Sequence, residues 1–132
     1  SDAMESFGVG ERLLLTAMLH IGRAFVAGEP ELSRAALARK CRVSGETLEP
    51  VLRALVSGGW VSLTAGDPPG YLPAKALDKI EIAQLWRTAH THSTGDAPEV
   101  VTLLREVDAA ITLGLHGTTL HDWVVRSTAK PT

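Results

Sequence analysis

Hydrophobic positions follow a helical period through most of the chain. Between residues 9 and 27 apolar side chains recur every three or four positions, which predicts an amphipathic helix with a broad buried face. Gly28 follows the last of these positions, and Pro30 prevents the helix from continuing. The residues predicted to point inward are Leu13, Leu14, Ala17, Met18, Ile21 and Phe25.

Two further helices are predicted across residues 34–57, separated by a tight turn at residues 42–44. Ser33 is a natural N-cap for the first of them. The second places Leu48, Val51, Leu52 and Leu55 on one face and ends at Gly58 and Gly59.

The start of this second helix is ambiguous, because Ser44 and Thr47 are both suitable caps. If Thr47 is the cap, Pro50 falls in the first turn, where its missing N–H costs little. We therefore favour Thr47, or a loose turn at Ser44 that tightens there.

A β-hairpin is predicted after the third helix. Residues 60–64 favour a strand, GDPPG at residues 66–70 is a cluster of turn residues, and residues 71–74 return as a second strand. Three helices followed by a hairpin are the order of a winged helix. The predicted fold class is mainly α with a small β-hairpin wing, a winged helix-turn-helix with additional C-terminal helices.

The C-terminal third is predicted to be helical. Its long helix, from residue 99 to 115, has an apolar stripe that we expect to be core, with a two-fold dimer contact as the second interpretation. That stripe consists of Val100, Leu103, Leu104, Val107 and Ile111. The predicted organisation is an expression remnant at 1–3, a winged helix-turn-helix domain at 4–91, a loop at 92–98, a helical appendage packing on it at 99–127 and a frayed tail at 128–132.

Composition indicates one ordinary domain and narrows the class of function. The chain has 132 residues, is 45% hydrophobic and carries a net charge of −2, so nothing global points to nucleic acid. Cys41 is the only cysteine, which excludes an internal disulfide and suits a reducing cytoplasm. The most apolar run, which starts at Leu13, is interrupted by His20 and Arg23 and is shorter than the roughly 20 apolar residues that a membrane span requires.

No residue pattern supports catalysis, a metal or a cofactor. The 5 histidines lack the His-Glu-x-x-His spacing, and His90 and His92 lie two apart at a helix end, where they diverge. Cys41 lies beside cationic residues that could lower the pKa of its thiol, but a packing role is favoured. The sequence contains neither a nucleophile elbow nor a phosphate-binding loop, so we predict that the chain is not an enzyme.

The helix-turn-helix supplies the candidate contacts with nucleic acid or with a protein partner. In such a motif the start of the second helix meets the bases, and here it carries Glu46 and Glu49, which phosphates would repel. The wing has Asp67 and no Lys or Arg. These charges favour a protein contact over DNA. The candidate residues are Arg42, Ser44, Glu46, Thr47, Glu49 and Arg53.

Two short sets of motifs resemble known families. SGGWV at 57–61, GYLPA at 70–74 and KIEIAQLW at 79–86 resemble the Rrf-type winged-helix regulators, the family of the iron–sulfur-cluster repressor. The cysteine cluster of that family is missing here, and its Gly-rich basic wing becomes GDPPG.

The second resemblance is closer. GRAFVAGEPELSRAALARKC at 22–41 and GYLPAKALDKI at 70–80 are similar to the soluble C-terminal extension of the YihY/BrkB inner-membrane proteins, often labelled ribonuclease BN. This resemblance implies a cytoplasmic, non-catalytic regulatory or interaction domain. Its partner would be another protein or its own membrane domain, and a homodimer through the C-terminal helices is a further expectation. The alternative is an Rrf-type DNA-binding regulator without an iron–sulfur cluster.

Overall fold

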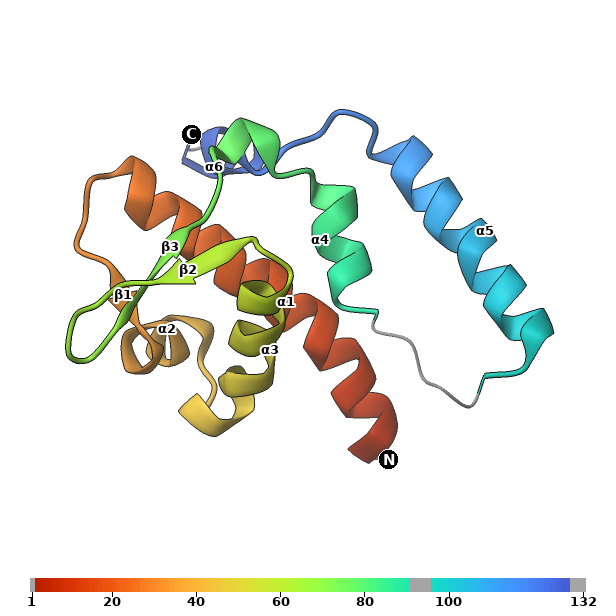
Figure 1. Ribbon diagram of the computed structural model, residues 1–132, viewed down its shortest axis with the longest axis horizontal. Helices are drawn as coiled ribbons and strands as arrows, with labels where there is room; N and C mark the ends of the chain where they lie inside the picture. The colour runs from red at the N-terminus through yellow and green to blue at the C-terminus, as the bar shows by residue number, and fades with distance from the viewer. Residues whose placement is uncertain (1, 91–95, 129–132) are drawn as a thin grey trace.

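The long helix α1 (Asp2–Val26) is the axis on which the other elements pack (Figure 1). The computed structural model describes the backbone of residues 2–90 and 96–128, and side chains from residue 10 onward within those ranges except that of residue 128. The helices α2 (Arg34–Cys41), α3 (Gly45–Ser57), α4 (Ile82–Thr88) and α6 (Leu120–Thr128) and the strand β3 (Gly70–Pro73) all contact α1. The remaining elements are β1 (Leu32–Ser33), β2 (Val61–Leu63), the short 3-10 helix η1 (Leu77–Lys79) and α5 (Pro98–Gly114).

A single hydrophobic core joins these elements, and α1 supplies its centre. Leu14, Met18 and Ile21 of α1 are buried, as the helical period predicts. Phe25 is different: it belongs to the same sequence period, yet it is 52% exposed. Val26 beside it is also exposed, whereas Ala24 is buried, so the described elements cover only one side of the last turn of α1. The buried partners of α1 include Leu37, Leu48, Leu52, Leu55, Ile80, Leu85, Leu120 and Val124.

The wing is a three-stranded antiparallel sheet in the order β1-β3-β2. The predicted hairpin corresponds to β2 and β3, which confirms the winged helix-turn-helix fold class. The two-residue strand β1 was not predicted, because two residues are too few to show an alternating pattern. A Cβ atom at Gly70 would clash with the Cβ of Glu31, so only glycine allows β1 and β3 to approach this closely.

The helix α6 completes the core by packing on α1 and η1. Its N-terminus is capped reciprocally: the Thr119 N–H donates to Asp122 Oδ2 at 2.9 Å, and the Asp122 N–H donates to Thr119 Oγ1 at 3.2 Å. The Thr119 hydroxyl also donates to Asp122 Oδ2, at 3.1 Å. The hydrogen bonds from the Thr119 N–H and from its hydroxyl lower the pKa of the Asp122 carboxyl. Gly22 lets α6 approach α1, because a Cβ there would lie 3.1 Å from Val124 Cγ2.

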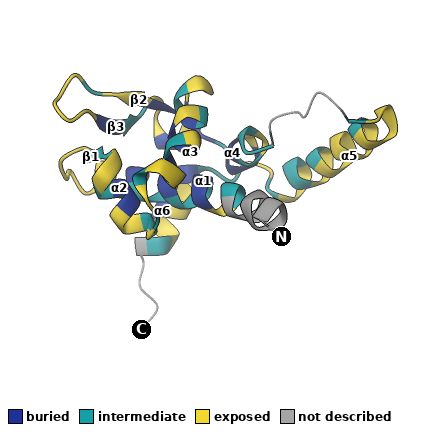
Figure 2. Ribbon diagram, turned by 90° about the horizontal axis from the view of Figure 1, so that it is seen from below, coloured by how far each residue is buried: buried dark blue, intermediate teal, exposed yellow. Residues whose placement is uncertain are grey.

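The long helix α5 is not a core helix, contrary to our first interpretation of its apolar stripe. None of its residues is buried, and Figure 2 shows it projecting from the body with mostly exposed positions. Its main contacts are with α4. An amphipathic period therefore exists here without a covering partner among the residues that the structure describes. The stripe members Val100, Leu103, Leu104 and Val107 are 44–58% exposed.

Some predicted boundaries shift. α1 begins at Asp2, so residues 2 and 3 continue the helix, and α6 extends to Thr128. Most of the loop expected at residues 92–98 lies outside the described residues, and α5 starts at Pro98. Within the described ranges, no helix has the length and apolar character needed to cross a membrane.

Replacing Leu52 with Ala should reduce the free energy of unfolding by roughly 2–5 kcal/mol, because the side chain is 1% exposed in the centre of the core. Urea denaturation followed by circular dichroism measures this change. Leu63→Ala is the matched control, since Leu63 is 49% exposed and should cost less than about 1 kcal/mol. Equal losses in the two variants would contradict the assignment of the buried face of α3.

Candidate nucleic-acid interface

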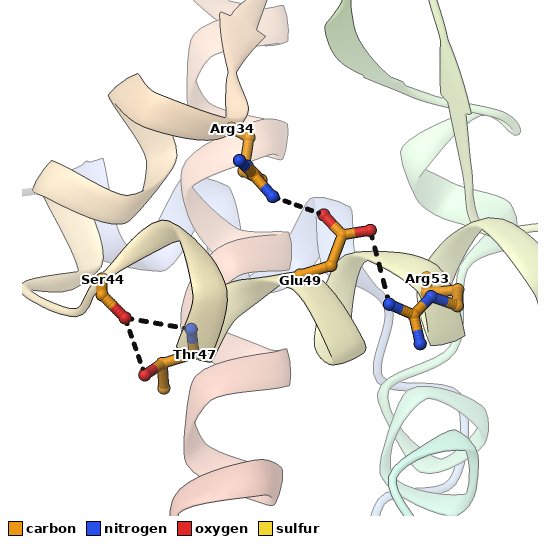
Figure 3. Close-up of polar contacts among 5 residues, drawn as sticks. All are labelled: Arg34, Ser44, Thr47, Glu49 and Arg53. Carbon is orange, nitrogen blue, oxygen red and sulfur yellow. Dashed lines mark hydrogen bonds and ion pairs between the residues drawn. The ribbon is translucent and has the colours of Figure 1, made fainter.

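Serine caps position both helices of the helix-turn-helix. The Ser33 side chain accepts a hydrogen bond from the Ala36 N–H at 3.2 Å at the start of α2. Ser44 does the same for α3, accepting from the Thr47 N–H at 3.0 Å, and its hydroxyl donates to Thr47 Oγ1 at 2.9 Å (Figure 3). Our preference for Thr47 as the cap is therefore wrong. Thr47 lies inside the first turn and supports the cap from there.

Pro50 consequently lies inside α3, and its missing N–H leaves the carbonyl of Glu46 without a helical partner. The helix tolerates this because Glu46 is exposed, so water can hydrogen-bond to that carbonyl. The local cost is offset by the buried face of α3, which ties the helix to α1 and α2.

The turn between α2 and α3 depends on Arg42, which adopts the left-handed conformation with φ 61° and ψ 41°. For a residue with a side chain this conformation costs about 1–2 kcal/mol. Glycine commonly occupies such a turn, so the sequence contained no signal for a left-handed residue here. The Arg42 side chain is exposed beside the start of α3.

Glu49 is held between two arginines on the outer surface of the motif (Figure 3). Arg34 of α2 donates to Glu49 Oε1 at 3.1 Å, and Arg53 Nη2 lies 3.6 Å from Glu49 Oε2. Exposed ion pairs of this kind contribute little stability. Their consequence is electrostatic: the negative charge of Glu49 is compensated within the protein.

The outer face of α3 is open. Glu46, Thr47 and Arg53 are exposed, whereas the opposite face is buried against the core. Residues 31–57 contain five cations (Arg34, Arg39, Lys40, Arg42, Arg53) against three carboxylates (Glu31, Glu46, Glu49), although the whole chain has a net charge of −2. The helix-turn-helix is therefore the locally positive part of an acidic protein.

The wing adds no cation at its tip. The loop between β2 and β3 carries Asp67 and is closed by a hydrogen bond from the Gly70 N–H to Thr64 Oγ1 at 2.8 Å. Lys75, just after β3, lies over the Trp60 ring at 4.4 Å from its centroid. Trp60 in turn donates from Nε1 to Thr88 Oγ1 at 2.8 Å, which fastens the base of the wing to α4.

The cysteine and histidine residues considered above for catalysis or metal binding make contacts within the fold. Burial raises the pKa of the Cys41 thiol, so the neighbouring cations do not activate it as the sequence alone allowed. His90 Nδ1 lies 2.9 Å from the Trp86 carbonyl, and its Nε2 lies 3.3 Å from Glu11 Oε1. His92 lies outside the described residues. Within the described part of the chain, no three His, Cys, Asp or Glu side chains gather as a metal site would require.

Similar folds occur among solved regulators. CymR (YrzC), the global cysteine regulator of B. subtilis, matches with a TM-score of 0.67 and 23% identity over 89% of this chain and 94% of that one. T. potens IscR matches with a TM-score of 0.72 and 21% identity over 93% and 90%. Staphylococcus aureus CymR matches with a TM-score of 0.67 and 20% identity over 88% and 95%. This chain has the winged-helix fold of these regulators.

The similarity to solved structures extends from the helix-turn-helix into the C-terminal helices, because nearly the whole length of each chain is covered. No family model and no curated protein sequence matches. These neighbours agree with the resemblance to the Rrf-type regulators, whereas nothing supports the resemblance to YihY/BrkB membrane proteins. The neighbours are regulators and not enzymes.

Replacing Ser44 with Ala removes the cap of α3 and should reduce the free energy of unfolding by roughly 1 kcal/mol. Urea denaturation measures the loss. Ser62→Ala, an exposed position in β2 with no hydrogen bond described for its side chain, is the control and should change stability by less than about 0.5 kcal/mol. A larger effect at Thr47→Ala than at Ser44→Ala would instead restore Thr47 as the cap.

Proposed function

We propose that this protein is a DNA-binding transcriptional regulator with α3 as its recognition helix. The observation that carries the proposal is the division of α3 into a fully buried face and an uncovered outer face within a complete helix-turn-helix. A helix held in this way can enter the DNA major groove without exposing the core. The likeness to solved regulators over nearly the full chain supports the proposal.

The contacts divide into two kinds. Residues at the start of a recognition helix reach the base edges, so Glu46 and Thr47 are the proposed base-reading residues. A carboxylate can accept a hydrogen bond from the amino group of cytosine, which makes cytosine the base that Glu46 would favour. Arg42, Ser44 and Arg53 are the proposed phosphate contacts, because cations and hydroxyls at the rim of the helix fix its register on DNA.

The compensated charge of Glu49 removes the main objection to DNA binding. From the sequence alone, Glu46 and Glu49 of α3 are both expected to repel the phosphate backbone. With Glu49 paired to Arg34 and Arg53, only Glu46 presents an uncompensated carboxylate at the start of α3. The wing supplies no cation, so affinity depends on the helix-turn-helix.

A second copy of the chain is the proposed partner of α5. One winged-helix unit makes few base contacts, and helix-turn-helix regulators commonly bind two half-sites as two-fold dimers. The α5 helix has 17 residues, about 25 Å in length, and its apolar stripe has no partner within the described residues. Pairing of two such stripes around a two-fold axis would bury them.

We propose no iron–sulfur cluster for this regulator. Such clusters are held mainly by several cysteine thiolates, and this chain has one cysteine, in α2.

Binding to random duplex DNA, measured by fluorescence anisotropy, should weaken steeply between about 50 and 200 mM salt as counterions re-associate. Arg42→Gln and Arg53→Gln should each weaken binding and reduce the salt slope by roughly 1. Lys79→Gln removes the same charge from η1, on the far side of α1 from α3 (Figure 1), and should leave binding unchanged. Absence of binding at low salt would overturn the proposal and favour a protein-contact module.

Leu104→Asp should convert the dimer to a monomer, because it places a charge in the middle of the α5 stripe. Size-exclusion chromatography with light scattering measures the mass. The matched control is Leu63→Asp in the wing, where the side chain is exposed to a similar extent and the dimer should persist. A wild-type chain that is monomeric at micromolar concentration would contradict the proposed interface.

A further inference from the structure

A groove of about 540 Å³ lies between α4 and α5. Its volume is in the range of about 300–1,000 Å³ that is typical of small-molecule sites. Arg87 lines it from α4, and Arg105, Asp108, Thr112 and Leu113 line it from α5. His116, just beyond the end of α5, completes one end of the groove.

The groove has an excess of positive charge. Arg87 and Arg105 come from the two facing helices, and Asp108 is the only carboxylate among the lining residues. Within the described part of the chain, ion pairs form between Glu49 and its two arginines and between Glu11 and His90, but not at Arg87 or Arg105. A guanidinium cannot lose its charge, and its planar donors match a carboxylate or a phosphate. The two arginines are therefore available to an anion.

The rest of the lining suits an apolar group. Leu113 is 78% exposed at the groove, so its side chain is accessible to an apolar part of a ligand. Thr112 adds a hydroxyl beside it. We propose that this groove binds a small organic anion, with its carboxylate or phosphate between Arg87 and Arg105 and its apolar part against Leu113.

The groove and the apolar stripe lie on different sides of α5. At roughly 100° per residue, the mean direction of the groove residues is about 150° from that of Val100, Leu103, Leu104 and Val107. A second copy packed on the stripe would therefore leave the groove open. Ligand binding and dimerisation can occur on the same helix without competing.

An anion held by both arginines would tie α5 to α4. This matters because α5 has no buried residue and makes its main contacts with α4, so its orientation depends on few interactions. In a dimer joined through α5, that orientation sets the separation of the two α3 helices and thus the fit to two half-sites. This regulatory consequence rests on the proposed function, whereas binding of the anion does not.

The test is a titration of the full chain, without DNA, followed by two-dimensional ¹H–¹⁵N NMR. Benzoate, which combines a carboxylate with an apolar ring, is the probe; benzyl alcohol is its neutral control. Benzoate should cause saturable shifts at the amides of Arg87, Arg105, Thr112, Leu113 and His116, and benzyl alcohol should not. Inorganic phosphate should shift the signals of the two arginines but not that of Leu113.

The double variant Arg87→Gln, Arg105→Gln should weaken benzoate binding roughly tenfold or more, because charge-assisted hydrogen bonds are lost. Both arginines are exposed, so the variant should fold, and a thermal melt verifies this. The control Lys79→Gln, Arg126→Gln removes the same charge at exposed positions elsewhere and should bind benzoate as the wild type does. Shifts that do not saturate, that occur outside the groove or that survive in the double variant would overturn the site.

The DNA experiment is separate from this one. Benzoate binding in the groove by a protein that does not bind DNA would leave the site standing and remove the proposed function. DNA binding with no benzoate shifts in the groove would remove the site and leave the proposed function standing.

Discussion

The packing of α3 against α1 is the contact on which the rest of the structure depends. Leu48, Leu52 and Leu55 are at most 1% exposed, and they meet the buried face of α1 in the common core. This burial orients α3 so that its other face points outward. The same contact that stabilises the fold therefore creates the surface through which a helix-turn-helix would act.

Charge on that surface is decided by local pairing and not by the net charge of the chain. Arg34 and Glu49 are separated by 15 positions in sequence, and α2 and α3 bring them together. The pairing of Glu49 reduces the electrostatic repulsion between α3 and a phosphate backbone, because the protein's own arginines already compensate its charge. A net charge of −2 is then a poor guide to this face of the molecule.

The two C-terminal helices α5 and α6 differ in how far they are buried in the core. α6 completes it through Leu120 and Val124, at 2% and 1% exposure, whereas α5 lies outside it with an apolar stripe on one side and a cationic groove on another. A helix that is weakly held by its own chain is well suited to being positioned by something else. A second subunit and a small anion are the two occupants that we propose for its surfaces.

Much of the fold was predictable from the sequence, because its signals are local. The helical period of α1 and α3, the glycines and prolines of the wing turn and the cap at Ser33 each act over a few residues. The structure confirms the winged helix that they indicate. The candidate surface residues could also be named, since the start of α3 follows from the order of elements. The pairing of charges on that surface could not be predicted, because the Arg34–Glu49–Arg53 contact depends on how α2 and α3 cross.

Tertiary structure alone decided the remaining points. Ser44 and Thr47 are both able to cap α3, and the choice of Ser44 is favoured by the buried face that holds α3 in place despite Pro50. Strand β1 forms only because β3 passes beside it. The α5 stripe has the period of a core helix, but a period shows only which side of a helix is apolar. Whether that side is covered by the same chain, by another copy or by nothing depends on the arrangement of the whole molecule.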